Sequence, residues 1–497
     1  MMVRISHEFR SCPGQESLFT PACRTLSRVV GMLRSMNPRM VNIDRQTPML
    51  LPPDLREWVP ADDMVHLVIE SVESMNLSTL KFNRRGTGSE QYPPKMMLAL
   101  LIYCYANGLF SSRRIERATW RDVAVRYLTG DTHPDHDTIC TFRRENFAAV
   151  SQAFVQVLQV ARQMGVLKVG TVSSDGTHLK ANASKKRTVR YDRAGELDRV
   201  LERDIAELMK KAEQIDQQEG EDGQRLPEKI AHRTKLRERI QQARAALEAQ
   251  AKANARAEHA EYQRKVAAHQ QRVAQHQRGV GRPPTPPIPE AQAMPAPEDS
   301  INLTDPESRA MRKNSAEGSQ QAYNAQAVVD ADGSMLVLAA RVVTTSVDYG
   351  QLEANVAKID PSLGQPTTVL ADAGYLKAES IQALEQRGME VYIAVTRQQN
   401  APSRKFDLRA EPAEKLERAI SHPVVQAMHD KLNTKPAQKI YRQRRQSVEP
   451  VFGIIKSVMG FRQFLLRGLA KVIGEWSLVT LAYNFKRLWR LRPIIAN

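Results

Sequence analysis

Residues 190–300 interrupt a series of expected β-strands with a long helical pattern. Apolar residues recur there at spacings of three and four, the period of an amphipathic helix: Leu197, Leu201, Ile205, Leu208, Ala212 and Ile215. The sequence EGEDG and Pro227 break this run before the pattern resumes, which predicts an antiparallel helical hairpin. The Gln- and Ala-rich AHQQRVAQHQRG and the proline-rich PPTPPIPEAQAMPAP follow, and they are typical of an extended or disordered linker. Residues 190–300 are therefore predicted to be an insertion between the strands.

Strand patterns occur on both sides of this insertion. Before it, G-T-V-S-S-D-G-T-H-L-K-A alternates as a strand carrying Asp175 would. After it, the strand-like runs QQAYNAQAVVDA and MLVLAARVVTT are joined by the turn pair Asp332-Gly333. Next come a helix near residues 351–358, a buried strand in TTVLADAGY that ends at Asp372, a helix in KAESIQALEQRG and a strand in EVYIAV. The predicted fold class is α+β, with a mixed sheet flanked by helices.

Residues 46–165 carry helical patterns, and we expect an all-helical domain there. The segment HDTICTFRRENFAAVSQAFVQVLQVARQ is expected to form one helix, capped by Asp137 or Thr138. Six arginines are expected on the surface of these helices: Arg113, Arg114, Arg117, Arg121, Arg143 and Arg144. They suit DNA contact by a helix-turn-helix-like arrangement, and a solvated charged surface is the alternative.

The formal net charge of +17 indicates the kind of partner. At pI ≈ 9.7 this chain of 497 residues attracts polyanions, of which nucleic acid is the commonest large one, and anionic membrane is the competing candidate. No run of about eighteen apolar residues is present to span a bilayer, and the N-terminus lacks the apolar core of a signal peptide. We expect a cytoplasmic protein, with residues 1–45 as a basic flexible leader or the product of an early start codon.

Three acidic residues lie on elements that can bring carboxylates together. Asp175 lies in the first expected strand, Asp372 ends a buried strand, and Glu449 lies on a C-terminal helix. Two divalent ions about 3.5–4 Å apart activate a water or hydroxyl group and stabilise the leaving oxygen in a phosphodiester displacement, and they need converging carboxylates. Mg²⁺ takes such oxygen ligands. The three acids are therefore candidate metal ligands.

Each acid also has a purely structural interpretation. Asp175 precedes a glycine, as in many turns, and Asp372 is placed to cap the helix that begins near Lys377. Glu449 lies four residues after Arg445 and seven before Lys456, so on a helix both cations share its face and can pair with it. Spacing alone leaves both interpretations open.

Longer motifs surround these acids. They read S-D-G-T-H-L-K-A-N-A-S, V-L-A-D-A-G-Y, R-x-x-x-E-x-x-x-x-x-x-K-x-x-x-G-F-R-x-F-L-L-R-G and E-W-S-L-V-T-L-A-Y-N-F-K-R-L. Together they resemble the DDE transposases of bacterial insertion sequences, in the branch marked by a Tyr-Arg-Glu-Lys signature. The resemblance covers the chain from about residue 45 onward.

The resemblance implies an RNase H-like core in which Asp175, Asp372 and Glu449 form the catalytic, metal-binding triad. The cofactor it implies is Mg²⁺, with Mn²⁺ as a substitute. Water cuts one strand at the ends of the mobile element, and the freed 3′ hydroxyl attacks target DNA. The implied partners are the terminal inverted repeats and the target DNA, bound by a homodimer at the bacterial nucleoid. The candidate DNA-binding residues are Arg445, Lys456, Arg442, Tyr441, Arg462, Arg113 and Arg114.

The C-terminal motif departs from the family pattern at one position. The family tyrosine belongs seven residues before the glutamate, where this chain has Arg442, and Tyr441 stands one residue earlier. Neighbours on a helix are about 100° apart, so Tyr441 is not expected to reach the site. Pro450 directly follows Glu449 and predicts a kink or a helix start at Glu449.

The predicted domains are a basic leader (1–45), a helical DNA-binding domain (46–165), the first part of the catalytic core (166–189), the hairpin insertion with its linker (190–300), and the remaining core with the C-terminal helices (301–497). Two alternatives to a transposase stay open. A structure-selective RNase H-like nuclease would share the triad but not the C-terminal block. An inactive DNA-binding derivative of a transposase would not need all three acids, and all three are present.

Overall fold

The computed structural model describes residues 54–82, 90–216, 226–276, 294–312, 318–395, 420 and 422–495. These residues all belong to one unit, Asp54–Asn497. The leader predicted for residues 1–45, and the part of the proline-rich linker that precedes residue 294, lie outside the described residues.

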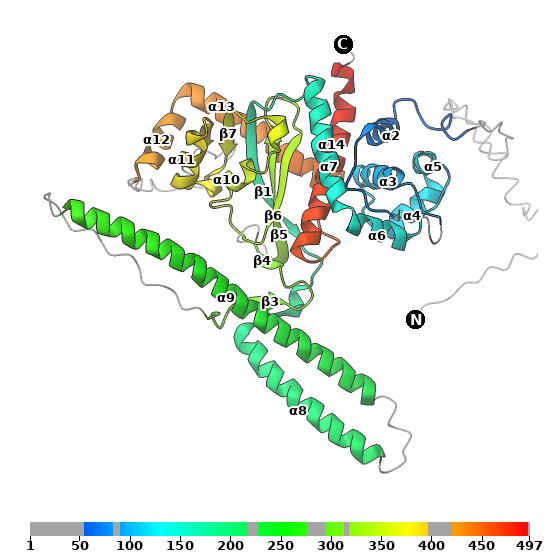
Figure 1. Ribbon diagram of the computed structural model, residues 1–497, viewed down its shortest axis with the longest axis vertical. Coiled ribbons are helices and arrows are strands. Elements are labelled where there is room, and N and C mark those ends of the chain that lie inside the picture. The colour runs from blue at the N-terminus through cyan, green and yellow to red at the C-terminus, as the bar shows by residue number, and fades with distance from the viewer. Residues whose placement is uncertain are drawn as a thin grey trace, which may run out of the picture. The chain divides into compact units, whose positions relative to one another are not determined.

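A mixed β-sheet forms the centre of the fold (Figure 1). Its strands are β1 (Thr171–Lys180), β4 (Arg309–Met311), β5 (Gln320–Asp330), β6 (Val337–Val343), β7 (Thr368–Ala371) and β8 (Glu390–Ile393). β5 pairs antiparallel with both β6 and β1, β1 runs parallel to β7, and β7 runs parallel to β8. β5 is buried along nearly its whole length because its small and apolar residues are covered on both faces. The strands before and after the insertion therefore form one sheet, with β1 at its centre.

Helices from the C-terminal part of the chain flank this sheet. They are α10 (Leu352–Val356), α11 (Ala378–Gln386), α12 (Pro423–Leu432), α13 (Lys435–Gly453) and α14 (Leu469–Ile495). α14 packs its apolar face into the core, where the fully buried Trp476 donates its indole N–H to the carbonyl oxygen of Gln326 on β5 at 3.0 Å. The predicted fold class, a mixed sheet flanked by helices with a helical N-terminal region, is confirmed. This is the arrangement of an RNase H-like core.

The N-terminal region is helical and packs against α14. Its helices are α2 (Met64–Ser74), α3 (Pro94–Ala106), α4 (Ser112–Arg121), α5 (Val123–Thr129), α6 (His136–Glu145) and α7 (Phe147–Gln163). Every residue of α3 from Met97 to Ala106 is buried, so this helix forms the centre of the region. A Cβ added at Gly474 of α14 would lie 2.3 Å from the ring of Phe147, so glycine permits the close contact between α14 and α7.

The single helix expected around Phe142 is wrong, because the chain forms α6 and α7 with a break at Asn146. At this break, the side-chain oxygen of Asn146 accepts a hydrogen bond from the backbone N–H of Lys81 at 2.7 Å. The cap of α6 is Asp135, which accepts from the Thr138 amide at 2.6 Å, and not Asp137 or Thr138. A distant backbone contact has thus overridden a local helical pattern.

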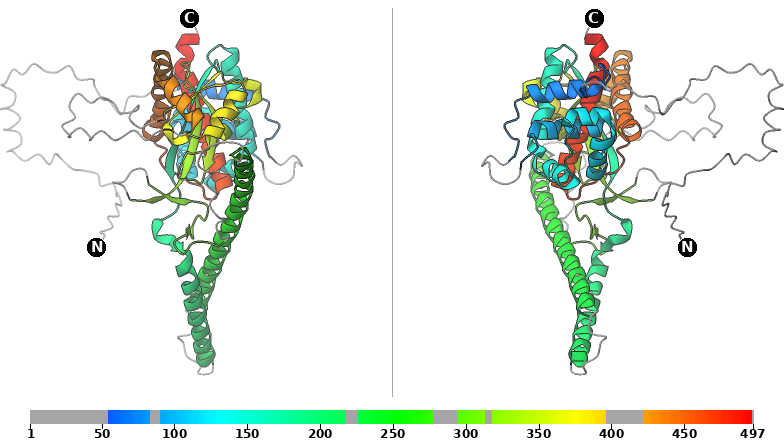
Figure 2. Two further views of the ribbon diagram at one scale, coloured as in Figure 1. Left: turned by 90° about the vertical axis from the view of Figure 1, so that its left-hand side faces the viewer. Right: turned by 90° about the vertical axis from the view of Figure 1, so that its right-hand side faces the viewer.

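The insertion after β1 contains two long helices, α8 (Tyr191–Asp216) and α9 (Leu226–His276). The linker expected to begin with AHQQRVAQHQRG is wrong for its first part, because α9 continues to His276. They lie side by side as the predicted helical hairpin (Figure 2). Leu201 and Ile240 are buried between them, and Arg237 of α9 pairs with Asp198 of α8 at 2.9 Å. The strands β2 (Thr188–Arg190) and β3 (Ser300–Asn302) pair at the base of the insertion and bring its two ends together. Across the described parts of the chain, we find no helix with the length and apolar character needed to cross a membrane.

Candidate active site

Two of the predicted acids lie beside each other on neighbouring strands. β1 and β7 run parallel with Ser174 opposite Ala371. Asp175 is the next residue after Ser174, and Asp372 is the next residue after Ala371. Neighbouring strands are about 4.8 Å apart, which places both carboxylates in one site. Asp175 lies inside β1 and not in a turn. Asp372 accepts from the Gly374 amide at 2.9 Å and caps the short 3-10 helix Ala373–Tyr375, not the later helix α11.

Burial makes two negative charges at this position unfavourable. The side chain of Asp175 is 16% exposed, and burial, followed by the charge of Asp372, raises the pKa of Asp175 to about 7. Burial also raises the pKa of Asp372, although the neighbouring Arg444 acts to lower it. The site therefore favours a bound cation or a proton.

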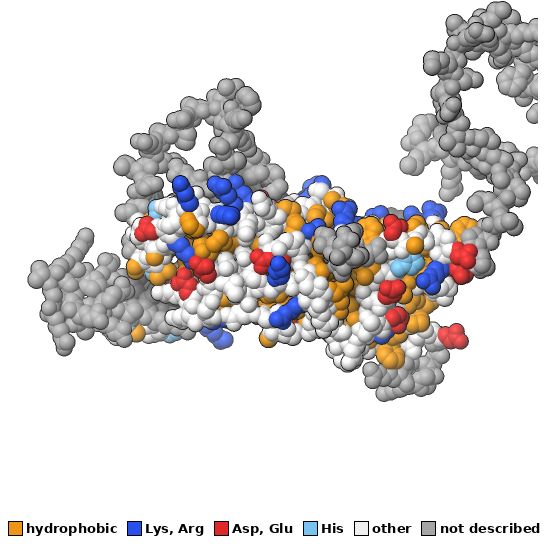
Figure 3. Space-filling view, turned by 90° about the horizontal axis from the view of Figure 1, so that it is seen from above, with side chains coloured by type: hydrophobic (Ala, Val, Ile, Leu, Met, Phe, Trp, Pro, Cys, Tyr) orange, Lys and Arg blue, Asp and Glu red, His pale blue; other side chains and the backbone are white. Residues whose placement is uncertain are grey.

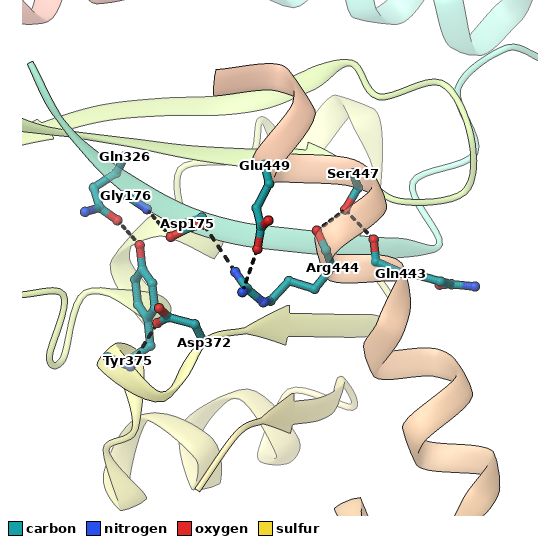
Figure 4. A network of polar contacts seen from close by, with 10 residues as sticks. Asp175, Gly176, Gln326, Asp372, Tyr375, Gln443, Arg444, Ser447 and Glu449 are labelled. Atoms are coloured by element: carbon teal, nitrogen blue, oxygen red, sulfur yellow. Dashed lines mark hydrogen bonds and ion pairs between the residues drawn. The ribbon is translucent and has the colours of Figure 1, made fainter. Parts of the chain in front are cut away.

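In this structure Arg444 provides the cation (Figure 4). Its Nη1 lies 3.2 Å from Asp175 Oδ2, and its Nη2 lies 3.0 Å from Glu449 Oε1. The Arg444 side chain is 7% exposed, whereas that of Glu449 is 50% exposed. The third predicted acid is therefore connected to the pair on the sheet through a guanidinium group. Arg444 was not predicted as a site residue, because a residue five positions before Glu449 does not have the three- or four-residue spacing of helix neighbours.

The residues predicted to surround Glu449 on α13 take different positions. Arg445 is exposed, and the ion pair that the structure gives Glu449 comes from Arg444. Burial acts to lower the pKa of Arg444, but the charges of Asp175 and Tyr441 raise it. Tyr441 therefore lies close to the arginine that enters the site. Tyr441 and Arg444 are three positions apart and share a helix face. Arg444 thus stands one residue before Arg445, just as Tyr441 stands one residue before Arg442.

The helix that carries Glu449 continues past it. α13 runs from Lys435 to Gly453 through Glu449 and Pro450, so of the two expectations for Glu449, a kink or a helix start, the helix start is wrong. Buried Val451 and Phe452 hold the helix against the core beyond the proline. The chain then forms a π-helix, Ile454–Val458, on which Lys456 donates to the Thr177 hydroxyl and to the His178 carbonyl oxygen at 3.3 Å. Lys456 is therefore held on β1, two residues beyond Asp175.

A loop after the π-helix presents Arg462 close to Lys456. The Arg462 carbonyl oxygen accepts from the Lys180 amide at the end of β1 at 3.3 Å, and Arg462 Nε donates to the Lys456 carbonyl oxygen at 3.0 Å. The carboxylate of the buried Glu475 on α14 accepts hydrogen bonds from the backbone amides of Leu465 and Leu466, each at 3.0 Å. Burial raises the pKa of Glu475 to about 7. A buried acid thus fixes the loop that carries Arg462.

Two segments of the chain match families of known proteins. Residues 53–145 match a family described as Transposase domain (DUF772), and residues 290–485 match one described as Transposase DDE domain. The chain carries the domains of a DDE-type transposase. No curated protein and no solved structure matches the chain.

The two matched segments of the chain include Asp372 and Glu449 but leave out Asp175. The helical insertion accounts for this gap, because it separates β1 in sequence from the strands that pair with it. The structure places β1 between β5 and β7, so Asp175 lies inside the sheet that the DDE domain forms.

The donor atoms at this site suit a divalent metal ion. All three candidate ligands are carboxylates, which are the hard oxygen ligands that Mg²⁺ prefers. Burial, followed by the charge of Asp372, raises the pKa of Asp175, so a bound cation would stabilise its charged form. Among the described residues, no three acid, histidine or cysteine side chains already stand together as a metal-binding group. Arg444 lies between Asp175 and Glu449 instead. Binding of one ion by all three acids therefore requires the Arg444 side chain to move.

Of the six arginines predicted on the surface of the helical region, five are exposed and Arg143 is buried. Arg113 and Arg114 are exposed on α4, as expected. Arg143 is buried, which corrects the expectation that it is exposed, and it donates to the Tyr105 hydroxyl at 2.8 Å and to the Phe110 carbonyl oxygen at 3.0 Å. Arg143 therefore supports the packing of this region.

Proposed function

We propose that this transposase binds the ends of a bacterial insertion sequence and catalyses DNA strand cleavage and strand transfer. The observation that supports this most strongly is the placement of Asp175 and Asp372 side by side on parallel strands, with Asp372 inside the segment that matches a transposase DDE domain. Glu449 is linked to them through Arg444. Bound Mg²⁺, or Mn²⁺ in its place, would activate the attacking water or hydroxyl and stabilise the leaving oxygen.

In this proposal the acids and Arg444 have separate roles. Asp175 and Asp372 would hold a bound metal ion from the sheet, and Glu449 would hold it from α13. The Arg444 guanidinium, released from the acids, would bind a DNA phosphate, for which its planar pair of N–H donors is suited. Water attacks in the first step, and the freed 3′ hydroxyl attacks target DNA in the second.

The proposed DNA surface extends from the acids across the basic C-terminal residues. Lys and Arg side chains gather along one edge of the face seen in Figure 3. We assign DNA contact to seven residues of the chain: Arg442, Tyr441, Arg445, Lys456, Arg462, Arg113 and Arg114. Two DNA ends must be joined to one target, so we propose that a homodimer forms on DNA at the nucleoid.

Replacing Arg445 or Lys456 by alanine is expected to weaken binding to any DNA sequence. Each lost phosphate contact reduces the slope of log K against log salt by about 0.9. The measurement is fluorescence anisotropy at several salt concentrations. Lys431→Ala is the matched control, because Lys431 pairs with Glu390 at 3.2 Å and is assigned no DNA contact. Wild-type slopes in Arg445→Ala and Lys456→Ala would contradict the phosphate-binding assignment.

The function is tested with the purified full chain and duplex DNA from the regions that flank its reading frame. With MgCl₂ or MnCl₂ we expect a nick that leaves a 3′ hydroxyl at the element end, and no nick in EDTA. Joining of that 3′ end to a second duplex tests strand transfer. Cutting of branched DNA without regard to the flanking sequence would favour a structure-selective nuclease, and binding without any cutting would favour an inactive derivative.

A further inference from the structure

Asp348, in the segment between β6 and α10, places a fourth carboxylate beside the acidic pair. Its neighbours Val347 and Tyr349 are exposed, whereas Asp348 is half-buried. Its Oδ1 accepts hydrogen bonds from Asn324 Nδ2 at 2.8 Å and from Gln326 Nε2 at 2.6 Å. The Asp348 side chain therefore packs against β5, whereas its neighbours in the sequence are exposed to solvent.

The other partners of Gln326 hold its amide in one orientation. Its Oε1 accepts from the Tyr375 hydroxyl, a contact drawn in Figure 4, and from Asn355 Nδ2 at 2.9 Å. Because two donors face this oxygen, the amide nitrogen faces Asp348 and the Asn324 side-chain oxygen, the latter at 2.9 Å. Two buried amides thus direct N–H groups at one oxygen of Asp348, which stabilises a charged carboxylate.

Two glycines leave room for Asp348 to approach the acids. Gly176 follows Asp175, and a Cβ added there would lie 2.6 Å from Asp348 Oδ1. A Cβ added at Gly374 would lie 3.0 Å from Asp372 Oδ1 and 3.7 Å from Asp348 Oδ2. Burial is the main cause of the raised pKa of Asp175 and of Asp372, and the charge of Asp348 adds to both. Asp348 is therefore electrostatically part of the site, with its second oxygen near Gly374 and Asp372.

We propose that Asp348 is a positioning residue that holds a water molecule of the metal ion's hydration shell and so increases the affinity of the site for the ion. This inference rests on the proposed function. Mg²⁺ keeps several waters when carboxylates bind it, and these waters need acceptors. The two amides hold Oδ1 of Asp348, and Oδ2 is the oxygen on the side of Asp372.

The test measures binding of Mn²⁺ to the full chain without DNA by isothermal titration calorimetry. Asp348→Asn keeps an oxygen that accepts from Asn324 and Gln326 but removes the charge. We expect its Mn²⁺ affinity to fall about tenfold, as is typical when such an outer ligand is lost. Glu353→Gln is the matched control, since Glu353 is an exposed acid on α10, and it should bind Mn²⁺ as the wild type does. Asp372→Asn removes one of the proposed metal ligands, so the Mn²⁺ binding that this variant loses is the binding that belongs to this site.

Two further comparisons separate positioning of the ion from support of the fold. Asp348→Glu restores the charge on a longer side chain, and we expect its Mn²⁺ affinity to lie between those of the wild type and Asp348→Asn. Thermal unfolding in EDTA should show Asp348→Asn at least as stable as the wild type, because one repulsive charge is gone. Wild-type affinity in Asp348→Asn, with affinity lost in Asp372→Asn, would overturn the inference and leave the proposed function standing. Equal binding by Asp372→Asn and the wild type would overturn both.

Discussion

The Asp372→Asn variant is expected to lose metal-dependent strand cleavage by a factor of at least about 10³. A metal ion contributes several kcal/mol of charge stabilisation in the transition state, and each 1.36 kcal/mol changes the rate about tenfold. Asparagine keeps a side-chain oxygen that can accept from Gly374, so the turn after β7 should be retained. Single-turnover cleavage of an end-labelled duplex measures the loss, and anisotropy on the same DNA should show little change in binding.

Asp360→Asn is a closely matched control for this variant. Asp360 also caps a 3-10 helix, Pro361–Leu363, by accepting an amide hydrogen bond at 2.9 Å, but it takes no part in the acidic site. It should cleave at the wild-type rate. Cleavage by Asp372→Asn within about tenfold of wild type would remove Asp372 from the proposed mechanism, since that corresponds to only about 1.4 kcal/mol.

Much of the fold follows from local patterns in the sequence. Alternation and turn residues predict β1, β5, β6, β7 and β8, because each strand is bounded by glycine, proline or aspartate and carries a continuous or alternating apolar face. The hairpin of α8 and α9 follows from its helical period in the same way. Features that depend on distant contacts were missed. The break at Asn146 depends on the backbone of Lys81, and the burial of Arg143 depends on Tyr105 and Phe110.

The candidate site shows the same limit. Asp175 and Asp372 could be selected because each belongs to a recognisable strand, and their register in parallel strands brings them together. Arg444 was missed because its partner Asp175 lies far away in the sequence and Glu449 is five residues on. Asp348 follows an edge strand without any local signal. One signal was available on β5, where the polar residues Asn324 and Gln326 alternate in a buried run, and buried amides require partners.

Removing the Arg444 side chain is expected to destabilise the metal-free protein strongly. Arg444→Ala leaves Asp175 and Asp372 buried without the cation that pairs with Asp175, and breaking a buried ion pair from one side costs about 3–5 kcal/mol of unfolding free energy. The pKa of Asp175 in the folded wild type, about 7, is above its unfolded value, so stability falls as the pH rises through about 7. Without Arg444 this pKa rises further. The destabilisation should therefore be larger at pH 8 than at pH 6, as measured by urea unfolding in EDTA.

The same variant should respond more strongly to metal than the wild type does. The guanidinium and the ion compete for Asp175 and Glu449, so its removal should increase Mn²⁺ affinity and the stabilisation that saturating Mn²⁺ gives. Arg445→Ala is the matched control on α13, and an exposed arginine is expected to change stability by no more than about 1 kcal/mol. If Arg444→Ala and Arg445→Ala showed the same stability and the same response to Mn²⁺, Arg444 would not be the counter-ion of the acidic site. A larger response in Arg444→Ala alone would mean that the site carries its own replaceable cation, which the metal displaces.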